Sequence, residues 1–76
     1  MSTTIEVIEP GTRARTVSGA IPGFITSAKI GKTQGGFVVF YEFSYFSSDG
    51  YRQVWLEDFE FDTEEVFDTI KIGFKN

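Results

Sequence analysis

Apolar and polar residues alternate along the middle of the chain, which is the pattern of β-strands with one buried face. An early run, residues 24–30, is expected to place Phe24, Thr26, Ala28 and Ile30 on one mainly apolar face. Aromatic and β-branched residues are frequent, and Gly and Pro recur at about strand-length intervals, so the chain is expected to form short antiparallel strands. The clearest run covers residues 37–46, where one face carries Phe37, Val39, Tyr41, Phe43 and Tyr45.

Turn-forming residues divide the first part of the chain. A Pro-Gly turn at residues 10–11 closes a short leading strand. Residues 13–17 form the next expected strand, with Ala14 and Val17 facing inward, and a loop containing Gly and Pro follows at residues 18–23. These turns predict two short strands ahead of the longer central ones.

The Ser-Ser-Asp-Gly segment at residues 47–50 predicts a tight hairpin, because Asp and Gly tolerate the positive φ angles of such turns. The return strand, residues 51–56, is expected to turn Val54 and Leu56 toward the core. The acidic pair at residues 57–58 then predicts a tight turn or one turn of helix.

The C-terminal region allows two interpretations. Asp62 and Glu65 stand at capping-box spacing, which predicts a short helix near residues 63–70. Residues 70–74, however, alternate as a strand does. A helix followed by a strand and a single extension both remain open.

Five short strands, a Gly-rich loop and a tight hairpin predict an all-β fold, a small five-stranded antiparallel barrel or half-open sandwich. We expect one domain over residues 1–76, with a barrel core at about 10–62, a short N-terminal extension and a C-terminal extension at 63–76. Residues 10–62 resemble SH3-like barrels of the Tudor/KOW type, and are also similar to small, mostly uncharacterised barrels of phages and mobile elements. The segments that carry this resemblance are Gly23-Phe24-Ile25, residues 41–46 and residues 54–61.

Composition excludes several classes of enzyme. The 76 residues include no Cys and no His, so a thiol nucleophile, a thiolate zinc site and a His-dependent catalytic triad are impossible. A chain this short also has little material with which to wall a deep pocket. We therefore expect a protein that is not an enzyme and that needs no metal or cofactor.

The net charge of −4 is unevenly spread, because nine of the eleven acids lie in residues 41–76. An acidic protein is a poor default binder of nucleic acid. Four cations in the first half still leave nucleic-acid contact as an alternative: Arg13, Arg15, Lys29 and Lys32. No apolar run approaches membrane-spanning length and Cys is absent, so we expect a cytoplasmic protein without a membrane contact.

Aromatic residues make up 17% of the chain and suggest a binding surface. If Val54 and Leu56 face the core, Tyr51 and Trp55 turn outward, and Phe46 and Phe40 of the preceding strand lie beside them. A contiguous exposed aromatic patch usually marks an interaction site. In the alternative, the terminal segments lie over this patch and make it a second core, using Ile5, Val7, Val66, Phe67, Ile70 and Phe74.

The Tudor-type resemblance implies an aromatic cage for a methylated Lys or Arg, held by cation–π contact. The first loop, residues 18–22, lacks the Trp or Tyr of the family pattern. The positions that match the cage are Phe24, Tyr45, Phe46 and Tyr51, with Asp49 as its acidic partner.

We predict a small protein-interaction module, an adaptor or accessory factor, that is either a monomer or a homodimer. Acids such as Glu57 and Asp58 would rim its surface and favour a partner with a basic segment. The alternatives are a nucleic-acid-associated barrel and a structural homo-oligomer joined by exposed strand edges. The predicted partner-binding residues are Tyr45, Phe46, Asp49, Tyr51 and Trp55.

Overall fold

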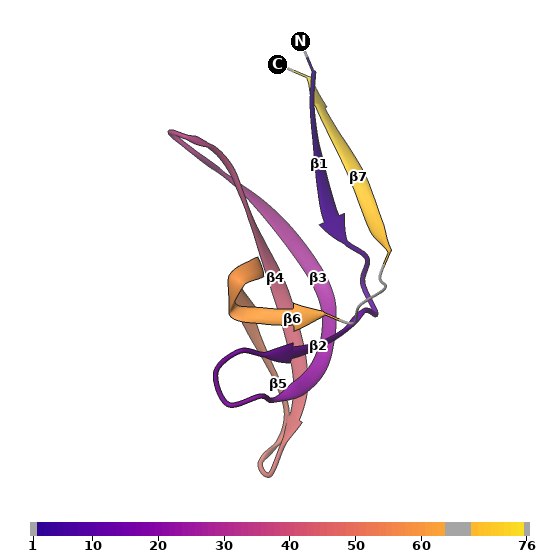
Figure 1. Cartoon of the computed structure of the whole chain (residues 1–76), viewed down its shortest axis with the longest axis vertical. Helices are drawn as coiled ribbons and strands as arrows, with labels where there is room; N and C mark the ends of the chain where they lie inside the picture. The colour runs from indigo at the N-terminus through magenta and orange to yellow at the C-terminus, as the bar shows by residue number, and fades with distance from the viewer. Residues whose placement is uncertain (1, 64–67, 76) are drawn as a thin grey trace.

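A computed structural model describes residues 2–63 and 68–75, with side chains at 4–63 and 68–73, and these residues form antiparallel strands with one turn of 3-10 helix (Figure 1). The all-β fold class is therefore confirmed. In chain order the elements are β1 (Ser2–Ile8), β2 (Arg13–Thr16), β3 (Pro22–Thr33), β4 (Gly36–Ser47), β5 (Gly50–Leu56), η1 (Asp58–Glu60), β6 (Phe61–Thr63) and β7 (Thr69–Lys75).

The described strands form two open sheets. The main sheet has five strands in the order β5-β4-β3-β2-β6, and β1 and β7 form a separate two-stranded sheet. The described residues thus hold seven strands, of which the five of the main sheet span residues 13–63. Neither sheet closes on itself, so the closed barrel stays a prediction.

A β-bulge in β3 decides which of its side chains reach the core. The register shifts between Ile25 and Ser27, so Ile25 opposes Phe43 while Ala28 opposes Tyr41. Directly opposed residues share a face, and Ile25 therefore lies on the core face together with Ala28. The expectation that Phe24 shares the apolar face with Ala28 is wrong, because the extra residue at the bulge reverses the alternation.

The core lies between the main sheet and the terminal strands. Its buried apolar residues are Val7, Ile8, Ala14, Ile25, Tyr41, Phe43 and Phe61. The Tyr41 hydroxyl accepts a hydrogen bond from the Ile8 backbone N–H at 3.3 Å, which ties β1 to β4. Burial raises the pKa of Tyr41, although this hydrogen bond partly offsets the rise. Ile5 and Ile72 pack against the same core, so the terminal strands cover this face.

Gly23 permits a close approach between β3 and β4. A Cβ atom at this position would lie 2.6 Å from Cζ of Phe43 and would also overlap the backbone oxygen of Ser44. The buried ring of Phe43 thus occupies the space that any side chain at position 23 needs. The Gly that opens the predicted strand is required by packing.

The predicted turns at residues 10–11 and 47–50 are confirmed. The acidic segment at 57–58 begins η1, where the Glu57 N–H donates to Oε2 of Glu60 at 2.8 Å. The inward position of Val17 is wrong: its side chain is 60% exposed, because β2 ends at Thr16.

The expected helix near residues 63–70 is wrong at both of its ends. Thr63 belongs to β6, and Thr69 and Ile70 belong to β7. The middle of that prediction, residues 64–67, lies outside the described residues. The terminal strand forms because β7 pairs with β1 over seven residues, which supplies backbone partners that an isolated helix turn lacks.

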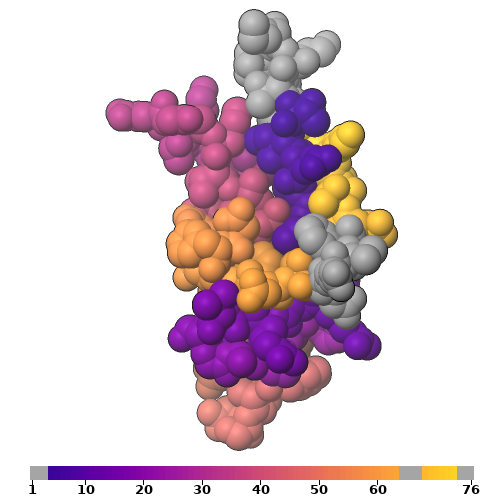
Figure 2. All heavy atoms as spheres, viewed as in Figure 1, coloured from indigo at the N-terminus to yellow at the C-terminus, as the bar shows by residue number. Residues whose placement is uncertain are grey.

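The molecule is elongated, with principal extents of 47 × 26 × 18 Å. Ser2 and Lys75 lie side by side at one end, and the β4–β5 turn lies at the other (Figure 1). The tip of the β3–β4 hairpin projects away from the terminal strands in the space-filling view (Figure 2). Among the residues described, no helix has the length and apolarity needed to cross a membrane.

Candidate binding groove

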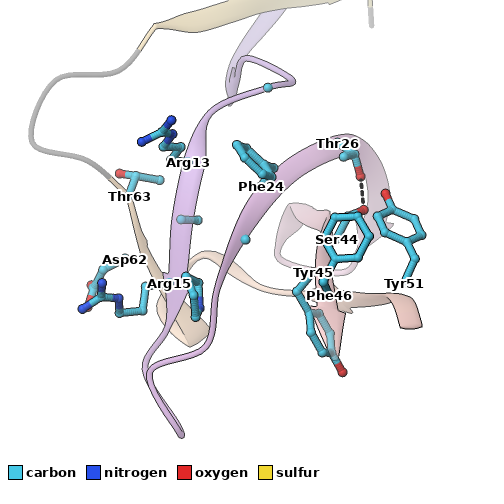
Figure 3. A pocket seen from close by; sticks show the side chains of 14 residues that line it. Arg13, Arg15, Phe24, Thr26, Ser44, Tyr45, Phe46, Tyr51, Asp62 and Thr63 are labelled. Carbon is cyan, nitrogen blue, oxygen red and sulfur yellow. Dashed lines mark hydrogen bonds between the residues drawn. The ribbon is translucent and has the colours of Figure 1, made fainter. Parts of the chain in front are cut away.

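An open groove of about 960 Å³ lies on the main sheet and reaches toward the β4–β5 turn, where Phe46 and Tyr51 line it. It takes residues from all five strands of that sheet (Figure 3). Its aromatic residues are Phe24, Tyr45, Phe46 and Tyr51, its charged residues are Arg13, Arg15 and Asp62, and Thr26, Ser44 and Thr63 add hydroxyl groups.

Strand register explains why these side chains meet. Arg13 opposes Phe24, and Phe24 opposes Ser44, so the three share one face of the sheet. Ile25, the neighbour of Phe24, faces the core, which places this set on the outer face. Phe46 and Tyr51 oppose each other on this outer face, near the β5 edge of the sheet. Arg15 and Asp62 oppose each other on the same face, near the β6 edge.

The aromatic rings of the groove are accessible. Phe46 is 79% exposed, Tyr51 54% and Phe24 44%. The rings of Phe46 and Tyr51 meet edge to face with centroids 5.3 Å apart, whereas Tyr45 stacks on the buried Phe43 at 5.7 Å. The alternative in which the terminal segments cover these aromatic residues is wrong, because β1 packs on the core face instead.

Trp55 lies on the outer face but outside the groove. The Nζ atom of Lys29 sits 4.5 Å from the centre of the Trp55 ring and 5.6 Å from that of Phe40. Lys29, Phe40 and Trp55 therefore form a separate cluster, which we call the Trp55 cluster. Because Trp55 is 43% exposed, this cluster is also accessible.

A polar band separates the Trp55 cluster from the groove. The Thr26 hydroxyl donates to Oε1 of Glu42 at 2.9 Å and lies 2.8 Å from the Ser44 hydroxyl (Figure 3). Gln53 donates to the same Ser44 hydroxyl at 3.4 Å. The four predicted outward aromatic residues thus form two clusters on either side of hydrogen-bonded side chains, and the expectation of one contiguous patch is wrong.

The acids predicted for the protein-binding surface lie outside the groove, whereas two of the cations predicted for nucleic-acid contact line it. Asp49 lies at the β4–β5 turn, where its carboxylate is 3.5 Å from the Arg52 guanidinium, and both side chains are solvent-exposed. It does not line the groove, and neither do Glu57 and Asp58. Two of the four predicted nucleic-acid contacts, Arg13 and Arg15, do line it. Lys29 and Lys32 lie elsewhere on the β3–β4 hairpin.

The groove therefore joins parts of two predicted sites that were alternatives to each other. Phe46 and Tyr51 of the predicted protein-binding surface lie with the two arginines. Tyr45 also borders the groove, but its ring stacks on Phe43 on the core face. Phe24, implied by the Tudor-type cage, is also present, while Asp49 of that cage is absent from the lining. Sequence reasoning missed Asp62, whose place follows only from the pairing of β6 with β2.

The groove offers aromatic faces, two guanidinium groups, one carboxylate and several hydroxyl groups. Within residues 2–63 and 68–75, no cluster of three or more acidic side chains has the geometry of a metal site. Neither a protein-family profile, nor a curated protein sequence, nor a solved structure matches this chain.

Proposed function

We propose that this chain is a small, non-enzymatic protein-interaction module built on a half-open SH3-like barrel of the Tudor/KOW type. The strand order supports the barrel, because five sequential strands share one sheet and η1 joins its two edge strands, β5 and β6. The ring contact between Tyr41 of β4 and Phe61 of β6, with centroids 5.5 Å apart, adds support. These strands are not neighbours in the sheet, so the sheet must curl to bring them together.

The observation that carries the function is the accessible aromatic lining of the groove. Contiguous exposed aromatic side chains on a small protein usually mark an interaction site, and aromatic residues and Arg are enriched among binding hot spots. The groove holds both kinds of residue, with Phe46 and Tyr51 the most exposed of its rings. An extended segment of another protein fits its open shape.

The charges of the groove indicate the chemistry of that segment. Two guanidinium groups and one carboxylate favour a ligand that carries a carboxylate beside its apolar residues. A methylated Lys or Arg is less suited, since Arg13 and Arg15 would repel it and Asp49 is not in the lining. That a basic segment of a partner binds the acidic surface near Glu57 and Asp58 stays a separate prediction.

The test selects linear peptides from a displayed random library and measures their affinities by fluorescence polarisation. We expect enriched peptides to combine aromatic or aliphatic residues with Asp or Glu. Phe46→Ala and Tyr51→Ala should each weaken binding by about 2 kcal/mol, roughly thirtyfold, which is typical of a hot spot. Phe59→Ala is the matched control, because Phe59 is 70% exposed and does not line the groove.

Peptides that bind all three variants as well as the original chain would refute the groove as the binding site. A library that yields no binder dependent on Phe46 or Tyr51 would refute the proposed function. Circular dichroism of each variant checks that a lost affinity does not arise from unfolding.

A second candidate function, binding of single-stranded nucleic acid, is favoured by the position of Arg13 and Arg15 beside exposed aromatic rings. Bases stack on such rings while cations contact phosphates. With two phosphate contacts, the slope of log K against log salt should be about −1.4, and Arg15→Gln should reduce its magnitude by about 0.7. A twelve-nucleotide oligo-dT is the probe and Lys32→Gln the control; a slope near zero would exclude this candidate.

A further inference from the structure

Strand β5 is an open edge of the main sheet, since β4 is its partner and the sheet ends there. The β4–β5 turn closes with Ser47 opposite Gly50, and the register continues without a shift to Leu56. In an antiparallel ladder, every second residue of a strand directs its backbone N–H and C=O groups to the strand on one side, and the residues between them direct theirs to the other side. The residues of β5 that direct their N–H and C=O groups to the free edge are therefore Tyr51, Gln53 and Trp55.

This edge lacks the usual protection against pairing with another strand. Natural edge strands are shortened, bulged, or interrupted by Pro or charged side chains. β5 has seven residues, an unshifted register, no Pro, and a single charged side chain, that of Arg52. In contrast, the opposite edge of the sheet, β6, has three residues, and β1 and β7 carry the charged pair Glu6 and Lys71.

We propose that β5 pairs with β5 of a second copy of this chain, antiparallel, with Gln53 opposite Gln53 on the two-fold axis. In this register Tyr51 opposes Trp55 of the second copy, and the same pair forms twice by symmetry. Cross-strand aromatic pairs stabilise antiparallel sheets. All three edge residues of each chain obtain backbone partners, and both aromatic pairs lie on the outer face.

Neighbouring registers fit less well. Placing the axis at Arg52 sets two guanidinium groups opposite each other, and like charges in that position are destabilising. Placing it at Val54 sets Tyr51 opposite Glu57 and separates the aromatic side chains. With the axis at Gln53, Arg52 opposes Val54, so no like charges face each other within residues 51–55.

The register also extends the groove of each copy. Tyr51 forms the β5 side of the groove, and Trp55 of the second copy would lie next to it. Trp55, which the sequence analysis placed in the binding surface, would then contribute to the groove of the other chain. The dimer does not depend on the proposed function, because its basis is the β5 edge alone.

The interface is small, which makes the dimer weak. Five paired residues from each chain are fewer than the about 20–30 a side of a stable interface. Each chain carries a net charge of −4, and Asp49 would approach Glu57 of the second copy at each end of the pairing. Repulsion of this kind is screened by salt, so association should strengthen as ionic strength rises.

The experiment is sedimentation equilibrium of the full chain from about 10 μM to about 1 mM, the range in which a weak interface responds to concentration. The average mass should rise from 8.6 kDa toward twice that value, more steeply at high salt. Gln53→Pro removes the edge N–H at the axis and should give a monomer. Gln53→Ala, which keeps that N–H, is the matched control and should still dimerise.

Amide hydrogen exchange of the unmodified chain tests the register even if Gln53→Pro does not fold. Exchange at Tyr51, Gln53 and Trp55 should slow as concentration rises, while exchange at Arg52 and Val54, which pair with β4, should not change. A chain that stays monomeric throughout the range overturns the proposal. So does a dimer in which exchange at these three edge amides is independent of concentration.

Discussion

Replacing Gly23 with Ala should destabilise the fold strongly, because the new Cβ has no space. It would lie 2.6 Å from Cζ of Phe43 and overlap the Ser44 backbone oxygen. Carbon atoms pack at about 3.5–4.0 Å, so the ring and the strand must separate by about 1 Å. Phe43 is fully buried and Ser44 belongs to the β4 ladder, so neither moves easily.

The expected cost is at the upper end of the range for overpacked cores, about 3 kcal/mol. A chain of this length has a total unfolding free energy of about 4–11 kcal/mol, so the substitution removes a large part of it. The midpoint of thermal unfolding should fall by about 12–24 °C for a domain of this size.

Urea denaturation followed by Trp55 fluorescence measures the change. Gly35→Ala is the matched control, since a Cβ at that position has no atom within 4 Å and the backbone there needs no positive φ. The control should be neutral or slightly stabilising, because Ala reduces the entropy of the unfolded chain. If the unfolding free energies of the two variants differ by less than about 0.5 kcal/mol, Phe43 does not pack closely against Gly23.

Three further predictions concern Tyr41 and Trp55. Tyr41→Phe leaves the Ile8 N–H without its acceptor and should cost about 1–2 kcal/mol in urea denaturation; an unchanged midpoint would contradict the hydrogen bond. Burial raises the pKa of Tyr41 above its ordinary value of 10.0, so the contribution of the neutral Tyr41 side chain to the unfolding free energy should be complete below pH 10 and lost as the pH rises further. This loss of stability should be absent in Tyr41→Phe. Lys29 lies over Trp55 and attracts anions, so Lys29→Met should reduce quenching of Trp55 by iodide but not by acrylamide; equal effects on both quenchers would contradict the contact.

Local signals were sufficient for the strands and turns of the chain's middle. The alternation in residues 37–46 gave the core face of β4, and Asp-Gly marked the β4–β5 turn. Val54 and Leu56 also predicted which face of β5 is turned toward the core, although Val54, on this edge strand, is 37% exposed. These features depend on neighbouring residues, so the sequence contains the necessary information.

Features set by pairing between distant segments were not predictable in this way. The bulge in β3 moves Ile25 to the core because β4 holds it opposite Phe43. The adjacent apolar pair Phe24-Ile25 breaks the alternation at this point, but such a break alone does not show which of the two residues faces the core. The groove depends on β2 lying between β3 and β6, which brings Arg15 and Asp62 to the outer face. Charge and aromatic patterns indicated the residue types that line the groove but divided them between two surfaces.

The pairing of β1 with β7 places Ser2 directly opposite Lys75, as Figure 1 shows at one end of the molecule. Opposed strands lie about 5 Å apart, so both chain ends leave from nearly the same point, far from the groove. Such geometry suits insertion into a surface loop of another protein or circular permutation with a short linker. A permuted chain opened at the exposed Gln34–Gly35 tip would keep the groove strands intact and should retain the fold.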